Sequence, residues 1–206
     1  LRDGRWIERS SRPQWVGGEV SGRVWSYRDV TQTRRVEAQL RASEERLREL
    51  ASRDALTGLF NRRFMQQRFC DEIDRARRSA RPFSVAMLDL DHFKGINDRH
   101  GHQTGDEVLR AFADDISKRV RKTDCVGRWG GEEFVLLLPE TPRSAALGVV
   151  EEVREHIGRE RDALPRFTVS AGVAEFPADG AELLPLIAAA DARLYEAKHA
   201  GRNCVR

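Results

Sequence analysis

The feature that most constrains how this chain folds is a pair of adjacent glycines, Gly130 and Gly131, between two short apolar segments. The segments 125–129 and 133–139 both have the composition of β-strands. Glycine reaches positive φ at little steric cost, so the sequence predicts a tight turn that joins these strands into a hairpin. The bare backbone at this tip also allows a ligand to approach closely.

Two adjacent carboxylates, Glu132 and Glu133, follow the glycines and repel each other. Successive side chains of a regular strand point to opposite faces, so we expect these two to face different sides. One of them can then reach a shared metal ion while the other serves the fold or a second contact. A plain exposed hairpin explains the glycines equally well, but it leaves a second acidic cluster unexplained.

That second cluster ends the apolar segment 83–91, which is predicted to be a strand. Strand alternation places Asp89 and Asp91 on the same face as Val85 and Met87. Carboxylates at the end of an apolar strand are costly to desolvate without a positive charge beside them, and Mg²⁺ binds such groups together with substrate phosphates. The alternative for Asp91 is that it caps the helix that follows.

Polar residues that suit a nucleotide follow at once in the sequence: Lys94, Asn97, His102 and Asp106. A lysine is a point charge for phosphate, and an Asn with an Asp can bind the donor and acceptor edge of a purine such as guanine. Taken singly, each of them is better explained as a surface lysine or a capping residue.

The region from about Asp54 to Arg206 alternates helical and strand patterns, which predicts an α/β architecture of one sheet with helices packed on it. Gly201 is the expected stop of the last helix. The predicted helices are 60–79, 105–120, 144–157 and 181–201, and the predicted strands are 83–91, 125–129, 133–139 and 166–177.

The first thirty residues predict two strands, 3–11 and 22–30, joined through a glycine-rich turn over 17–22. Two strands are not stable as a domain of their own, so we expect them to be the end of a larger unit. Because the sequence starts with Leu1 rather than Met, we also expect it to be a piece of a longer protein.

Residues 31–53 predict a helix, with Thr31 or Thr33 as its N-cap. Its seam residues alternate in spacings of four and three, which is the heptad pattern of a coiled coil. Two structures explain this pattern: an ordinary amphipathic helix that lies on its own domain, or a short parallel coiled coil between two protomers. The seam residues are Val36, Leu40, Ser43, Leu47, Leu50 and Asp54.

Composition excludes several classes of protein. Three cysteines without paired spacing argue against a disulfide framework or a zinc site and favour a reducing compartment. The 36 basic residues are scattered among 33 acidic ones, so we expect no nucleic-acid partner. The longest apolar run is far shorter than the roughly 20 residues of a membrane span.

Four motifs in order resemble the GGDEF family of bacterial diguanylate cyclases, from about Ser52 to Arg206. They are "RDALTGLFNRR", "DLDHFKGINDRHGH", "RWGGEEF" and "YEAKHAGRN". The first thirty residues resemble more weakly the end of a PAS sensor domain, with "DVT" at its junction to a signalling helix. The resemblance divides the chain into a PAS end (1–30), a coiled-coil-like signalling helix (31–53) and a cyclase domain (54–206).

The family resemblance implies a palm-like fold with a central, mostly antiparallel sheet flanked by helices. It implies a cytoplasmic catalytic domain that acts as a homodimer through the 31–53 helix. It also implies that two GTP are condensed into cyclic di-GMP and pyrophosphate, with two Mg²⁺ (or Mn²⁺) per active half-site. The implied metal ligands are Asp89, the Leu90 carbonyl and Glu132, and the implied catalytic residues are Glu132, Glu133 and Lys94. The implied substrate contacts are Phe93, Lys94, Asn97, His102, Asp106, Gly130, Gly131, Lys198 and Arg202.

Arg121 and Asp124 match the RxxD motif at which the product inhibits members of this family. A surface ion pair after a helix is the alternative explanation. Arg143 and Arg154 are candidates for a further arginine contact. A catalytically idle receptor for cyclic di-GMP is the alternative to an active cyclase, and the intact Asp89, Lys94 and Glu132 argue against it.

Overall fold

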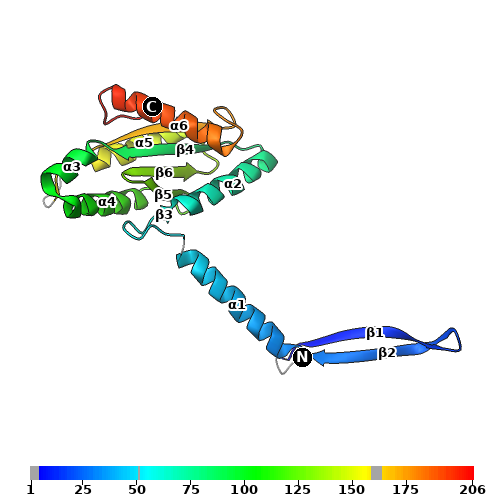
Figure 1. Cartoon of the computed structure of the whole chain (residues 1–206). Helices are drawn as coiled ribbons and strands as arrows, with labels where there is room; N and C mark the ends of the chain where they lie inside the picture. Colours follow the sequence, from blue (N-terminus) through cyan, green and yellow to red (C-terminus); the bar gives the residue numbers. More distant parts are fainter. Residues whose placement is uncertain (1–4, 51, 159–163) are drawn as a thin grey trace. The chain divides into compact units, whose positions relative to one another are not determined.

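A computed structural model describes residues 5–50, 52–158 and 164–206, with the side chains of residues 41–50 left out (Figure 1). The chain divides into two compact units, Leu1–Ala51 and Ser52–Arg206. Each unit is described separately below.

The N-terminal unit contains an antiparallel hairpin of β1 (Ile7–Val16) and β2 (Glu19–Asp29). The turn is shorter than the predicted 17–22, because only Gly17 and Gly18, at φ +61° and +88°, leave the strands. Trp25 and Tyr27 lie on one face of the hairpin, opposite Ser11 and Arg9, and stay largely exposed.

Helix α1 (Thr31–Leu50) follows the hairpin, and the predicted threonine cap is wrong. Thr31 is already the first helical residue, and its N–H donates to Asp29 Oδ1 at 2.9 Å. Its own hydroxyl accepts from the Trp6 amide instead. The seam residues Val36 and Leu40 are 54% and 59% exposed. The side chains at 43, 47 and 50 lie outside the described ones.

The C-terminal unit is built on one five-stranded sheet in the order β3-β5-β6-β4-β7. The strands pair antiparallel except β3, which is parallel to β5. The predicted fold class, a mostly antiparallel sheet flanked by helices, is therefore confirmed. The strands are β3 (Phe60–Asn61), β4 (Phe83–Leu90), β5 (Cys125–Gly130), β6 (Glu133–Leu138) and β7 (Val169–Phe176). The helices are α2 (Arg62–Ser79), α3 (Phe93–His100), α4 (His102–Ser117), α5 (Arg143–Ile157) and α6 (Leu183–His199).

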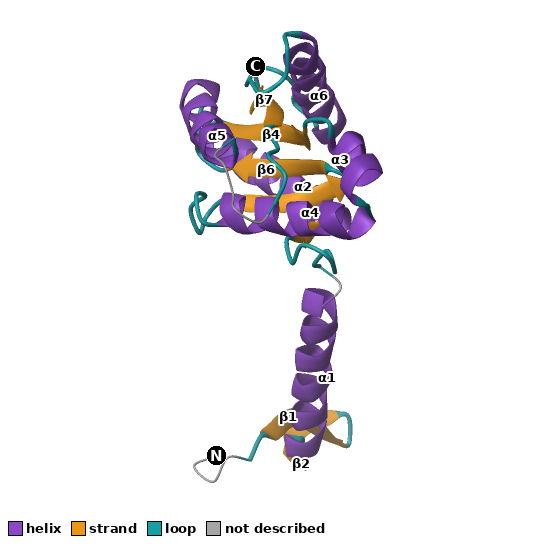
Figure 2. Ribbon diagram, turned by 90° about the vertical axis from the view of Figure 1, so that its left-hand side faces the viewer, coloured by secondary structure: helices purple, strands orange, loops and turns teal. Residues whose placement is uncertain are grey.

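Helices cover both faces of this sheet, and two apolar cores result (Figure 2). Val85 and Met87 of β4 pack with α2 and α6, whereas Ala86 and Leu88 pack with α4 and α5. This alternation is the one that the sequence predicts. Asp89 continues the first of these faces, so its side chain belongs to the side of α2 and α6.

Gly172 of β7 fixes how closely α6 lies on the sheet. A Cβ at this position would lie 2.1 Å from the Ala190 carbonyl oxygen and 2.3 Å from the Leu194 amide nitrogen. The helix backbone therefore rests directly on the strand, and a larger residue would have to push it away. Lys198 lies one helical turn after Leu194, so this contact also sets the position of Lys198.

We predict that Gly172→Ala lowers the free energy of unfolding by about 2 kcal/mol or more, because it overpacks rigid backbone. The melting temperature in calorimetry should fall by about 4–8 °C. Gly148→Ala on α5 is the matched control, since a Cβ there meets no atom within 4 Å. It should stabilise slightly by removing glycine from a helix. Equal melting temperatures for the two variants would contradict the role of Gly172.

Candidate functional site

The glycine tip forms the predicted turn between β5 and β6. Gly131 has φ +51°, and Gly130 pairs with Glu133 after a register shift. A Cβ at either glycine would meet no atom within 4 Å, so the backbone here faces open space. The tip can therefore receive a ligand against its main chain.

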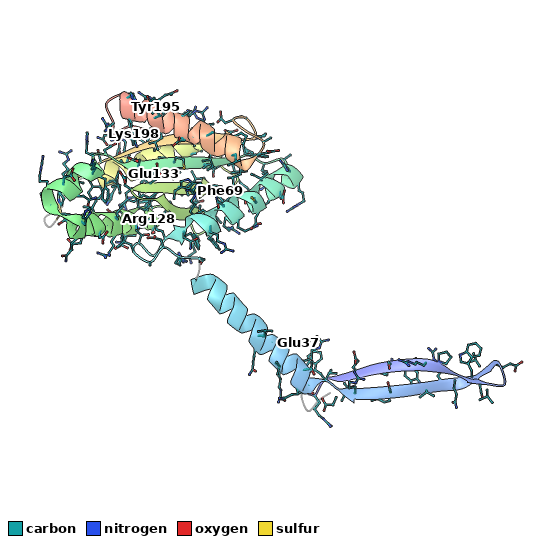
Figure 3. The ribbon with its side chains drawn as sticks, in the orientation of Figure 1. Glu37, Phe69, Arg128, Glu133, Tyr195 and Lys198 are labelled. Carbon is teal, nitrogen blue, oxygen red and sulfur yellow. The ribbon has the colours of Figure 1, made fainter. Side chains whose placement is uncertain are left out.

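Arg128 holds this tip in place, a role that the sequence analysis missed (Figure 3). Its Nε donates to the Gly131 carbonyl at 2.9 Å, and its Nη1 lies 3.2 Å from Asp54 Oδ1. Asp54 also accepts from the amide and hydroxyl of Thr57. Burial raises the pKa of Asp54, but these hydrogen bonds and the Arg128 charge outweigh it and lower the pKa. The "RDALTGL" and "RWGGEEF" motifs are thus joined by one ion pair.

Asp89 and Glu133 face each other across β4 and β6, with Asp89 directly opposite Glu133 in the ladder. Opposite residues of an antiparallel pair share a face, so two carboxylates are brought together there. The Leu90 amide donates to the Glu132 carbonyl at 3.3 Å, which ties the end of β4 to the hairpin tip. Asp89, Leu90, Glu132 and Glu133 therefore form one group.

Asp89 as a residue is only 6% exposed, and Lys198 Nζ lies 2.8 Å from its Oδ2. Burial raises the pKa of Asp89, Lys198 opposes the rise, and the nearby Glu132 and Glu133 add to it. The net direction is upward because one lysine offsets only part of the desolvation and repulsion. The site thus concentrates negative charge beyond what its own lysine neutralises.

Asp91 does not cap α3, and that alternative is wrong. His92 occupies the N-cap position at φ +58° and makes no side-chain cap hydrogen bond. The Asp91 carboxylate instead accepts from the hydroxyls of Thr168 and Ser170, each at 2.6 Å. It points toward β7 because the chain turns at His92.

The predicted purine-binding residues lie on α3 and α4, and α3 itself was missed as an element. Gly105 lets the two helices approach, because a Cβ there would lie 1.9 Å from Asn97 Oδ1 and 3.2 Å from the Phe93 ring. Asn97 therefore lies against the residue that precedes Asp106. Lys94 and His102 are exposed.

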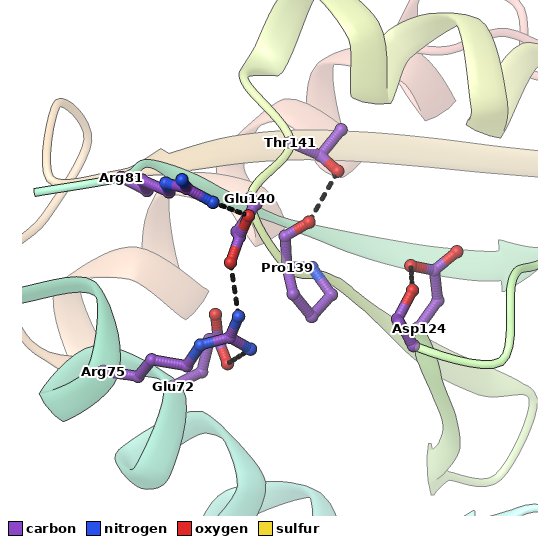
Figure 4. Close-up of polar contacts among 8 residues, drawn as sticks. Glu72, Arg75, Arg81, Asp124, Pro139, Glu140 and Thr141 are labelled. Carbon is purple, nitrogen blue, oxygen red and sulfur yellow. Dashed lines mark hydrogen bonds and ion pairs between the residues drawn. The ribbon is translucent and has the colours of Figure 1, made fainter. Parts of the chain in front are cut away.

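Arg121 and Asp124 line a separate cavity of about 180 Å³ with Glu140 and Thr141. It lies at the opposite end of the β5–β6 hairpin from the glycine tip, since Asp124 directly precedes β5. The Arg121 amide donates to Asp124 Oδ2 at 2.8 Å, which fixes the turn that carries both residues. In Figure 4 the Glu140 side chain points away from Asp124 toward Arg75 and Arg81, to which it is ion-paired.

Arg143 and Arg154, the two candidates for a further arginine contact to the product, bind other groups of the chain. Arg143 Nε donates to the Val173 carbonyl at 3.1 Å. Arg154 binds Glu151 and the Asn203 side chain. Neither lines the cavity of Arg121.

Within the described ranges, no three His, Cys, Asp or Glu side chains are gathered closely enough to hold a metal unaided. Mg²⁺ does not require such a cage, because it is commonly bound by one or two carboxylates plus substrate phosphates. The desolvated Asp89 with neighbouring glutamates fits that mode. None of the described helices is both long enough and apolar enough to span a membrane.

Residues 51–204 match the family described as "Diguanylate cyclase, GGDEF domain". Diguanylate cyclase DgcM of Escherichia coli K12 is 43% identical over 179 residues, covering 86% of this chain and 42% of the relative. The response regulator PleD of Caulobacter vibrioides is 39% identical over 196 residues, covering 91% of this chain and 42% of the relative. The chain thus spans less than half the length of these curated relatives.

A similar solved structure is that of the coiled coil and GGDEF domain of DgcB from Caulobacter crescentus in complex with c-di-GMP. It is 35% identical, with a TM-score of 0.75, and the match covers 84% of this chain and 94% of that one. Sequence, motif order and fold agree, and this chain therefore belongs to the diguanylate cyclase family with a GGDEF domain.

Proposed function

We propose that this chain condenses two GTP into cyclic di-GMP and two pyrophosphates. The observation that carries the proposal is the desolvated Asp89 carboxylate, facing Glu133 and held by Lys198 beside an open glycine turn. Such a concentration of carboxylates is unfavourable for the fold alone and suits a site that binds a cation with a phosphate.

We propose for each residue the role that the family resemblance implies. Asn97 and Asp106 bind the guanine edge, and Phe93 and His102 make further contacts to the nucleotide. Lys94, Lys198 and Arg202 bind the triphosphate, where cationic side chains stabilise the negative charge that accumulates during phosphoryl transfer. Gly130 and Gly131 let the nucleotide lie against the backbone, and Glu132 accepts the proton of the attacking 3′-hydroxyl. Glu133 sustains the negative field opposite Asp89.

Mg²⁺ or Mn²⁺ would be held by Asp89, the Leu90 carbonyl and Glu132, with two ions in each half-site. When bound, these ions activate the 3′-oxygen and neutralise charge on the phosphates. Lys198 is ion-paired with Asp89, and we propose that it also binds the triphosphate.

The reaction joins two nucleotides, so two cyclase domains must face each other, and their effective concentration governs the rate. We propose that α1 pairs with its counterpart in a second copy, a role supported by the exposure of Val36 and Leu40 on its heptad seam. The β1–β2 hairpin is proposed to end a PAS domain, as its exposed Trp25 and Tyr27 suggest. GTP as substrate implies that the catalytic domain works in the cytoplasm.

We propose further that cyclic di-GMP inhibits the enzyme at the cavity of Arg121 and Asp124. Arginine can bind phosphate as a fork or stack on guanine, and the Asp carboxylate can accept from the guanine edge. This cavity also favours the second candidate function, a catalytically idle receptor for the same nucleotide.

The cyclase proposal predicts that the purified chain with GTP and Mg²⁺ forms cyclic di-GMP, detected by chromatography and mass. Glu132→Gln should slow product formation by about 100-fold or more, because it removes a group needed at the reacting oxygen. Glu152→Gln, an exposed carboxylate on α5, is the control and should leave the rate unchanged. No product from the unchanged chain, or a Glu132→Gln rate within threefold of it, would contradict the proposal.

The inhibition proposal predicts that Arg121→Ala raises the inhibition constant of added cyclic di-GMP by about tenfold, through loss of a charged hydrogen bond. Lys118→Ala, an exposed basic residue at the end of α4, is the control. Isothermal titration with cyclic di-GMP gives the affinity independently of turnover. An unchanged affinity of Arg121→Ala for cyclic di-GMP would mean that the product binds elsewhere. If the unchanged chain binds cyclic di-GMP but turns over no GTP, the result would favour the catalytically idle receptor.

A further inference from the structure

Asp91 is a buried carboxylate to which the proposed reaction gives no role. Its side chain is almost fully enclosed, with 3% of the residue exposed. Oδ1 accepts from the Ser170 hydroxyl, and Oδ2 accepts from the Thr168 hydroxyl and from the Asn203 amide at 3.0 Å. Both oxygens are thus occupied by donors of β7, its approach and the C-terminal segment. A carboxylate suits this place because it only accepts.

The C-terminal partner of Asp91 lies in an unusual turn. Arg202 and Asn203 have φ +65° and +48°, and neither is glycine. Such residues persist in this region only where their surroundings hold them. The Asn203 amide also lies 3.1 Å from the Ser170 hydroxyl, and its side-chain oxygen accepts from Arg154 at 2.9 Å. The turn is therefore held from several directions.

Both ends of this turn are anchored. On one side the Arg202 amide donates to the Ala197 carbonyl at the end of α6. On the other, the Ala171 amide donates to the Cys204 carbonyl, and the Val173 amide donates to the Arg206 carbonyl. The final residues thus lie beside β7 and pair with it through one parallel bridge between Ala171 and Val205. Within the turn itself, Asp91 accepts from the Asn203 amide and so fixes the residue that follows Arg202.

We propose that Asp91 is a positioning residue that holds the Arg202–Asn203 turn so that Arg202 faces the triphosphate. Asp91 directly follows Leu90 and lies two residues before Phe93, so it links the metal-binding end of β4 to the turn that carries Arg202. The inference rests on the proposed function for the role of Arg202. It differs from a metal role, which would require Asp91 oxygens that β7 and Asn203 already occupy.

The test is Asp91→Asn, which keeps the shape but replaces one acceptor oxygen with a donor. The Michaelis constant for GTP should rise by about tenfold, the cost of weakening one charged contact to phosphate, while kcat changes less than threefold. Hydrogen exchange of the Asn203 amide, followed by NMR, should accelerate by at least about tenfold through loss of its acceptor. Asp114→Asn, an exposed residue of α4, should change none of these quantities.

A double-mutant comparison with Arg202→Ala decides whether Asp91 acts through Arg202. If it does, Asp91→Asn raises the Michaelis constant in the native background but hardly in the Arg202→Ala background. Fully multiplicative effects would overturn the proposal. A fall in kcat with an unchanged Michaelis constant would also overturn it, because that result assigns Asp91 to the chemical step.

Failure of the proposed function can be told apart from failure of this inference. If the unchanged chain forms no cyclic di-GMP, the role of Asp91 can still be tested by two measurements. These are the GTP affinity by equilibrium dialysis and the hydrogen-exchange rate of the Asn203 amide. Unchanged exchange and affinity in a folded Asp91→Asn protein overturn it. If that variant does not fold, Thr168→Val removes a single hydroxyl donor to the same oxygen, and it must raise the GTP dissociation constant in the same direction.

Discussion

The structure of the site depends on one desolvated carboxylate and the lysine that lies against it. Asp89 ends an apolar strand in the middle of the sheet, where water cannot solvate its charge, and Glu133 lies directly opposite it. Lys198 can reach it only because α6 rests on the backbone of Gly172. Packing of a helix on a strand therefore determines the electrostatics of the site.

The β5–β6 hairpin connects two chemically different places. At its tip, Arg128 holds the Gly131 carbonyl and is itself fixed by Asp54, so the turn beside Asp89 has a defined geometry. At its other end, the turn with Arg121 and Asp124 borders a small cavity. The same pair of strands thus carries Glu133 near one end and borders the cavity of Arg121 at the other.

Much of this architecture could be predicted from the sequence, because strand alternation and helical periodicity report local burial. The two faces of β4, the hairpin tip and the four long helices of the C-terminal unit followed from such patterns. Helix α3 did not, since a short polar segment containing Gly95 carries no apolar period. Strand β3 has only two residues and was included in the helix after it.

Contacts between segments far apart in the sequence were the main features that could not be predicted. The partner of Arg128 is 74 residues away, and nothing in either motif indicates that the two charges meet. The close approach at Gly105 and the hydrogen bonds of Asp91 likewise depend on packing that spacing does not encode. Thr31 failed as a cap because it is already helical: its own amide donates to Asp29, and its hydroxyl accepts from the Trp6 amide. The PAS assignment of the first hairpin stays a prediction.

The most direct measurement is the titration of the Asp89 carboxyl carbon by NMR in the native chain and in Lys198→Met. The pKa should lie above the usual 3.8 in the native chain and higher still without the lysine charge. Asp54 provides an internal reference in the same spectra, because its pKa is lowered. The pKa of Asp89 is higher in the folded chain than in the unfolded chain, so the folded protein binds this proton more tightly. The free energy of unfolding therefore falls as the pH rises from the unfolded pKa to the folded pKa. An Asp89 pKa at or below the usual value, or one unmoved by Lys198→Met, would contradict the account.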